Sequence, residues 1–118
     1  MMTEKGVLVV GVEYEGALHR DFEIRPQLVR DAVDAVEDDE RAKRNGSYRG
    51  VCVLARQITR LGGISKEKIT PLLLMEMHAA DMAAISEASR RLEARLTRFH
   101  GAKEGHDESG TRAQKAGI

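Results

Sequence analysis

The apolar and polar positions divide the chain into an extended N-terminal part and a helical remainder. The run Gly6–Tyr14 is rich in β-branched residues, and apolar and polar residues alternate along Ala17–Arg25, two patterns that favour strands. Glu15-Gly16 lies between the runs, and its glycine permits the positive φ of a tight turn. We therefore predict a β-hairpin. Its apolar face must pack on helices or on another chain, because two strands alone are marginally stable in water.

Shorter helices are predicted in the middle of the chain. Apolar residues recur at three- and four-residue spacings along Gln27–Glu40 and Ser47–Leu61, which indicates amphipathic helices. The polar stretch Arg41–Tyr48 between them predicts a loop. Further on, we expect a short helix over Lys66–Thr70 and a helical apolar run over Leu72–Met77.

The longest predicted helix covers Asp81–Phe99 and organises the C-terminal half of the core. Its seam alternates spacings of three and four residues and consists of Met82, Ile85, Ser89, Leu92, Leu96 and Phe99. Asp81 is expected to cap the helix N-terminus by accepting a backbone N–H. From His100 onward the chain is polar and rich in glycine, a composition that predicts disorder.

These elements predict an α+β fold with an N-terminal β-hairpin, a small bundle of three to four helices and a disordered C-terminal tail. We expect a disordered N-terminus over residues 1–5, one α+β domain over 6–99 and the tail over 100–118. The length of 118 residues suits one small domain.

The balanced charge of the chain argues against nucleic-acid and membrane-surface binding. Lys and Arg total 19, as do Asp and Glu, whereas both kinds of binding depend on a surplus of cations. No run approaches the roughly 20 apolar residues of a membrane span, and the N-terminus has no signal-peptide pattern. The single cysteine, Cys52, fits a reducing compartment and a small buried apolar role. We therefore expect a cytoplasmic protein.

One alternative is a small metal-dependent enzyme. His78 and Asp81 are three residues apart, a spacing that can place two ligands on one face of a helix. Metal sites need three or four ligands, and no second pair has a matching spacing. We therefore expect no catalytic residue, cofactor or metal, with His78 at the start of a helix beside a capping aspartate.

A second alternative is a DNA-binding regulator with a helix-turn-helix over Ala55–Ile69. Its recognition helix would carry Lys66 and Lys68 for phosphate contacts, but it would end before Pro71 after about five residues. It also lacks arginine and asparagine where base reading would be expected. The absence of net positive charge further disfavours this interpretation.

The region around the methionines has more apolar side chains than one helix face can bury. Leucines and methionines point nearly all round a helix over Leu72–Met77. Methionine is flexible and common on adaptable binding surfaces, although ordinary core packing also explains it. We predict partner contacts at Leu73, Met75, Met77 and Met82.

Three segments together resemble one protein family. Ile24–Val33 has an Arg-Pro pair at the end of a strand and an Arg-Asp pair in the first helical turn. Val53–Ile64 is a helix closed by a Leu-Gly turn, and Ala79–Phe99 is an apolar-seamed helix that ends in a phenylalanine. In this order, over residues 7–99, the segments resemble the Mu-like tail assembly chaperones of contractile-tailed phages and prophages.

The resemblance implies a non-enzymatic protein of the bacterial host cytoplasm. Members of that family hold the long helical tape-measure protein until tail-tube subunits polymerise around it. The implied partner is therefore a tape-measure protein, with a second copy or a frameshift-extended form of the chain as further candidates. The family supplies no catalytic residues.

Overall fold

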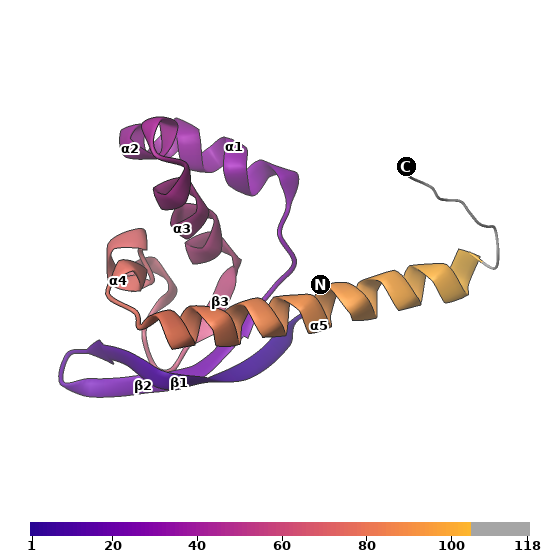
Figure 1. Ribbon diagram of the computed structural model, residues 1–118, viewed down its shortest axis with the longest axis horizontal. Coiled ribbons are helices and arrows are strands. Elements are labelled where there is room, and N and C mark those ends of the chain that lie inside the picture. Colours follow the sequence, from indigo (N-terminus) through magenta and orange to yellow (C-terminus); the bar gives the residue numbers. More distant parts are fainter. Residues whose placement is uncertain (105–118) are drawn as a thin grey trace.

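The protein is a three-stranded antiparallel sheet with helices packed on one of its faces (Figure 1). It is described by a computed structural model over residues 1–104. The elements follow in the order β1 Glu4–Tyr14, β2 Ala17–Ile24, α1 Val29–Asp38, α2 Glu40–Arg44, α3 Gly46–Gln57, β3 Ile58–Leu61, the 3₁₀ turn η1 Lys66–Lys68, α4 Pro71–Met75 and α5 Ala79–Glu104. The predicted α+β class is confirmed.

The predicted hairpin is present, and its strand β1 begins at Glu4, two residues before the predicted start. Glu15 and Gly16 both have positive φ, 51° and 79°, as a two-residue hairpin turn requires. The predicted apolar face of β2 is buried only near its end, at Phe22 and Ile24. Leu18, close to the turn, is 59% exposed.

A wide bulge interrupts β1 at its centre. Between the pairs Val7–Asp21 and Val12–His19, β1 contains residues 8–11 whereas β2 contains only Arg20. The Arg20 side chain donates from Nε to the Leu8 carbonyl, 3.0 Å away, and so satisfies one backbone group of the bulge. The extra residues bend the strand and leave backbone amides without partners in β2.

The helix predicted over Ser47–Leu61 is wrong in its last four residues, which form the third strand. Helix α3 ends at Gln57, and Ile58–Leu61 continues as β3, paired antiparallel with β2. Ile58 and Leu61 are three residues apart, so their spacing alone fits a helix as well as a strand with a register shift. Pairing with the edge of β2 decides the conformation. The backbone groups of Ile58–Leu61 find partners in β2 that they would not reach if α3 continued to Leu61.

The predicted loop over Arg41–Tyr48 also needs correction, because α2 covers its first part to Arg44 and α3 begins at Gly46. Asp39 caps α2 by accepting from the Arg41 amide at 3.0 Å, and Asn45 caps α3 by accepting from the Tyr48 amide at 3.0 Å. Both are favourable N-cap residues, so the short helix α2 forms, and α3 begins, where composition alone indicates a loop.

The interior has two parts. The main core lies between the sheet and α3, α4 and α5, and its largest fully buried apolar side chains are Leu8, Phe22, Ile24, Ile58, Leu61 and Leu92. A smaller core joins α1, α2 and α3 through Ala35, Ala42, Tyr48, Cys52 and Val53. Cys52 is buried there, as predicted.

The last helix begins earlier than predicted, and Asp81 does not have the predicted capping role. Helix α5 begins at Ala79, and His78 precedes it, with its Nδ1 accepting from the Ala80 amide at 3.0 Å. Asp81 is fully buried, and its two carboxylate oxygens accept from the amides of Val10 and Gly11, each 2.8 Å away. Asp81 therefore binds the bulge of β1 and does not cap its own helix.

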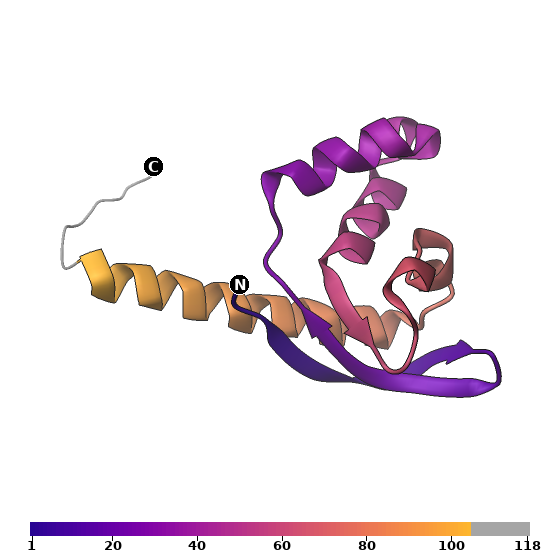
Figure 2. The same cartoon turned by 180° about the vertical axis from the view of Figure 1, so that it is seen from behind.

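The far end of α5 lies beyond the predicted boundary. The helix continues to Glu104, five residues past Phe99, and its C-terminal part extends beyond the sheet in both views (Figures 1 and 2). The rest of the predicted disordered tail, 105–118, lies outside the described residues. Over residues 1–104, no helix combines the length and the apolar character needed to cross a membrane.

Candidate partner-binding groove

An open groove of about 660 Å³ lies between α3 and the first half of α5. Ile24, at the end of β2, and Gln27, just after it, close one part of the groove, and Ala32 of α1 reaches its edge. Its walls come from two helices that the chain joins only through β3, η1 and α4. The remaining lining residues are Gly46, Ser47, Arg49, Gly50, Val51, Val53, Leu54, Gln57, Met82, Ile85, Ser86 and Ser89.

One stripe of α3 runs along the whole length of its wall. Gly46, Gly50, Val53 and Gln57 are separated by four, three and four residues, so they follow one another along one face. Val53 and Gln57 are buried, whereas the two glycines are exposed. The groove is therefore deep near the C-terminal end of α3 and open near its N-terminal end.

The α5 wall is apolar at its base and small at its rim. Ile85 is buried in the main core and Met82 is half-buried beside it. Ser86 and Ser89 complete this wall, and their short side chains leave the space between the helices open. Both walls thus combine an apolar floor with small residues, an arrangement that admits another helix more readily than a flat surface does.

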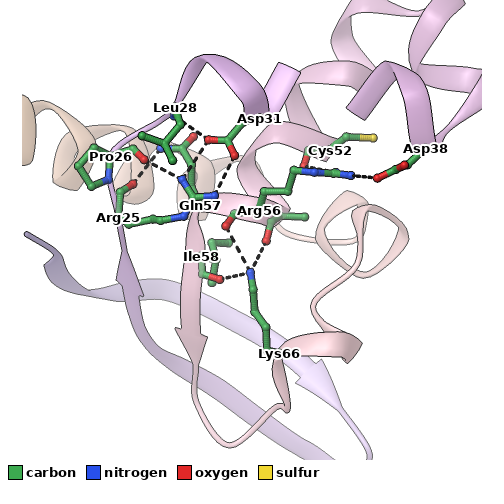
Figure 3. Close-up of polar contacts among 11 residues, drawn as sticks. Arg25, Pro26, Leu28, Asp31, Asp38, Cys52, Arg56, Gln57, Ile58 and Lys66 are labelled. Atoms are coloured by element: carbon green, nitrogen blue, oxygen red, sulfur yellow. Dashed lines mark hydrogen bonds and ion pairs between the residues drawn. The ribbon is translucent and has the colours of Figure 1, made fainter. Parts of the chain in front are cut away.

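A polar cluster holds the deep end of the groove in place (Figure 3). Arg25 donates from Nη1 and Nη2 to the two oxygens of Asp31, at 3.0 and 2.8 Å. Asp31 also accepts from the Leu28 amide at 2.7 Å, which fixes the start of α1. Gln57 donates from Nε2 to the Arg25 carbonyl at 3.1 Å, so α3 is tied to the same corner.

The electrostatics of this cluster favour the ionised carboxylate. The hydrogen bonds from Arg25, followed by that from the Leu28 amide, lower the pKa of Asp31 despite its burial. The same pairing raises the pKa of the Arg25 guanidinium. Because Asp31 is only 2% exposed, this pair is a rigid connection between β2 and α1.

Lys66 fixes the place where α3 becomes β3. Its ammonium donates to the carbonyls of Ala55, at 2.8 Å, and Ile58, both of which lie at the end of α3 (Figure 3). A cation is favourable at a helix C-terminus, where carbonyl oxygens lack intrahelical partners. Burial lowers the pKa of the Lys66 ammonium. Lys66, a phosphate contact in the DNA-binding alternative, therefore binds carbonyl groups of its own chain.

The predicted partner-contact residues do not all lie in the groove. Met82 lines it, whereas Leu73 and Met77 are half-buried against the main core. Met75 is 43% exposed on α4, next to the exposed Leu72. The four residues remain a predicted contact set, with Met82 the member that the groove contains.

The residues of the two alternative interpretations are used differently in the structure. The Asp81 carboxylate binds two backbone amides and His78 Nδ1 accepts from a third, so the pair is not arranged as ligands of a common ion. Among the side chains that the structure describes, those of residues 1–98, no group of three or more His, Cys, Asp or Glu could hold a metal ion. The segment Ala55–Ile69 contains the end of α3, the strand β3 and a 3₁₀ turn, and so it is not a helix-turn-helix.

The groove itself was not predicted from the sequence. The signal that could have indicated it is Gly50, a glycine inside an amphipathic helix, where it costs stability relative to alanine. No family model, no curated protein and no solved structure matches this chain.

Proposed function

We propose that this protein is a non-enzymatic tail assembly chaperone of a contractile-tailed phage or prophage, acting in the bacterial host cytoplasm. In this proposal it holds apolar helical segments of the tape-measure protein during tail assembly. The observation that carries the proposal is the groove between α3 and α5, with its apolar floor at Ile85 and Val53. A groove of this kind suits a helix that lays one apolar face into it.

The apolar surface continues outside the groove along α1. Val29 is 89% exposed and Val33, one turn later on the same face, is 48% exposed. Ala32, which lines the groove, is adjacent to this face of the helix. A client helix in the groove would lie beside these exposed apolar side chains of α1.

The resemblance supports the same site. Each of the three segments that carry it, Ile24–Val33, Val53–Ile64 and Ala79–Phe99, contributes residues to the lining of the groove. The Arg-Pro and Arg-Asp pairs of the first segment supply Arg25 and Asp31, which hold its deep end. The features that suggested the family are therefore concentrated around the proposed binding site.

The test is co-expression of the full chain with the tape-measure protein encoded in the same tail gene cluster. We expect a soluble complex that co-purifies through a tag on either partner, and an insoluble tape-measure protein when it is expressed alone. The variant that tests the groove is Ser86→Glu, which places a charge on its exposed rim and should abolish the complex without unfolding the chain. A tape-measure protein that stays insoluble beside the folded wild-type chain would refute the proposal.

A further inference from the structure

We infer that the groove selects a helix with small residues spaced four apart, packed against Gly46 and Gly50 of α3, and with a carboxylate beside Arg49. This inference rests on the proposed function, because it names the chemistry of the client that occupies the same groove. The groups that support it are two glycines that the packing of the chain does not require, the buried acceptor of Gln57 and the cation of Arg49.

The two glycines of α3 have no role in the packing of the chain itself. A Cβ added at Gly46 or Gly50 would meet nothing within 4 Å among the described residues, and neither residue has a positive φ. Inside a helix, Gly50 costs stability relative to alanine, so the fold alone would favour a side chain there. Glycine at this position instead permits another backbone to approach α3 closely.

Gly6 and Gly62 show the contrast. A Cβ at Gly6 would lie 2.4 Å from the Phe22 ring, and a Cβ at Gly62 would lie 2.3 Å from His19. Those positions exclude a side chain because the chain's own atoms occupy the space. At Gly46 and Gly50 the space that a side chain would occupy is left open by the described chain, and this space is in the groove.

The floor of the groove contains a buried acceptor without an internal donor. Gln57 is only 8% exposed and follows Gly46, Gly50 and Val53 along the groove face of α3. Its Nε2 donates to the Arg25 carbonyl, but among the side chains and backbone groups of residues 1–98 no donor reaches its Oε1. Buried polar atoms are normally paired, so this oxygen indicates a contact with a polar hydrogen from the client, such as a serine or threonine hydroxyl.

Among the described residues that line the groove, Arg49 alone is charged, and this sets the complementary charge of the client. Its guanidinium donates to the carbonyls of Ala42, at 2.9 Å, and Lys43, at 3.2 Å, which holds it at the open end of the groove. Among residues 1–98, whose side chains the structure describes, no carboxylate lies within 4.0 Å of it. A carboxylate on the client is the group that complements a guanidinium whose partners within the chain are neutral carbonyls.

These groups define the length and pattern of the client helix. From Gly46 to Gln57 the stripe covers about 16 Å of helix, at about 1.5 Å per residue, so about three client turns contact it. The matching client face has Ala, Gly or Ser at four-residue spacing opposite the glycines. It has a serine or threonine opposite Gln57 and an aspartate or glutamate opposite Arg49.

The probes are 25-residue peptides tiled along the tape-measure protein, with affinity for the full chain measured by fluorescence anisotropy. We expect the tightest peptide to carry the small-residue pattern and an acidic residue. Gly50→Leu should weaken that peptide roughly tenfold or more, while the urea midpoint of the variant is not lowered. Gly63→Ala is the matched control, because Gly63 is exposed in the turn after β3, a Cβ there makes only an ordinary contact, and binding should not change.

The charge is tested by Arg49→Lys and Arg49→Gln, which both remove the guanidinium. Arg49→Gln should weaken binding roughly fivefold and reduce its salt dependence, whereas Arg49→Lys should retain most of the affinity. If the wild-type chain binds a peptide and Gly50→Leu binds it equally well, this inference fails and the proposed function stands. If no tiled peptide binds the wild-type chain, both fail.

Discussion

Arg25 holds Asp31 through two hydrogen bonds, and this ion pair connects the end of the sheet to the first helix. The pair lies where β2 stops and α1 begins, with Pro26 between them in the chain. Gln57 joins it from α3, so three elements meet at one corner of the groove. The position of the α3 wall thus depends on a contact that is remote from the groove's open end.

Asp31→Ala should lower the free energy of unfolding by about 3 kcal/mol, because it leaves a partly buried arginine without its partner. Urea denaturation followed by circular dichroism measures this. The control is Asp34→Ala, which removes a carboxylate from the same helix that makes no ion pair within the described residues. Equal losses for the two variants would contradict the assigned role of Asp31.

The stability of the protein should fall in acid, and Asp31 should contribute to this. Its hydrogen bonds from Arg25 depress its pKa in the folded state below the value of about 3.9 in the unfolded chain. A depressed carboxyl pKa gives stability that is fully present above the unfolded pKa and is lost as the pH falls through the folded pKa. Glu4, whose pKa is lowered chiefly by its hydrogen bond from Arg91, acts in the same direction.

The measurement is the free energy of unfolding of the wild type and of Asp31→Asn between pH 7 and pH 2. We expect the two curves to converge as the pH falls. Protonation removes the negative charge of Asp31 from the wild type, and the substitution has already removed it from the variant. Parallel curves over the whole range would show that Asp31 does not titrate differently in the folded state.

Asp81→Ala should destabilise the protein by about 2 kcal/mol, because the amides of Val10 and Gly11 lose their acceptor. Hydrogen exchange at these two amides should accelerate more than exchange at other β1 amides. Glu93→Gln, an exposed change on the same helix, is the control and should leave both readouts unchanged. Slow exchange retained at Val10 and Gly11 in Asp81→Ala would contradict this assignment.

Met82→Ser should weaken client binding more than Met75→Ser does, although both belong to the predicted contact set. Met82 lines the groove, so its truncation removes apolar surface that a client helix would cover. Met75 is exposed on α4, outside the groove lining. Peptide affinity measured by anisotropy orders the two variants, and a larger effect at Met75 would move the binding surface to α4.

The hairpin and the long helix could be predicted from the sequence because their patterns are local. Alternation along β2, a glycine at the turn and the seam of α5 each depend on neighbours within a few residues. Strand β3 could not be predicted in this way. Ile58 and Leu61 have a spacing compatible with a helix, and the pairing with β2 and the cation of Lys66 decide the outcome.

The roles of the polar residues were harder to predict than the elements. Asp81 has the right position and chemistry to cap a helix, and nothing local shows that its acceptors serve the bulge of a strand about 70 residues earlier. The groove was missed for a similar reason, since it is formed by α3 and α5, which are distant in the chain. Gly50 was the one local signal, because a glycine inside a helix is unfavourable unless space is needed there.

The bond between Asp81 and the β1 bulge also determines when the chain can finish folding during its synthesis. The two partners are 70 and 71 residues apart, so the first strand leaves the ribosome long before its acceptor exists. Until α5 emerges, the apolar residues of β1 lack the helix that covers them, and closing so long a loop is entropically slow. Nascent chains of this protein should therefore expose their N-terminal hairpin to other factors until α5 has emerged.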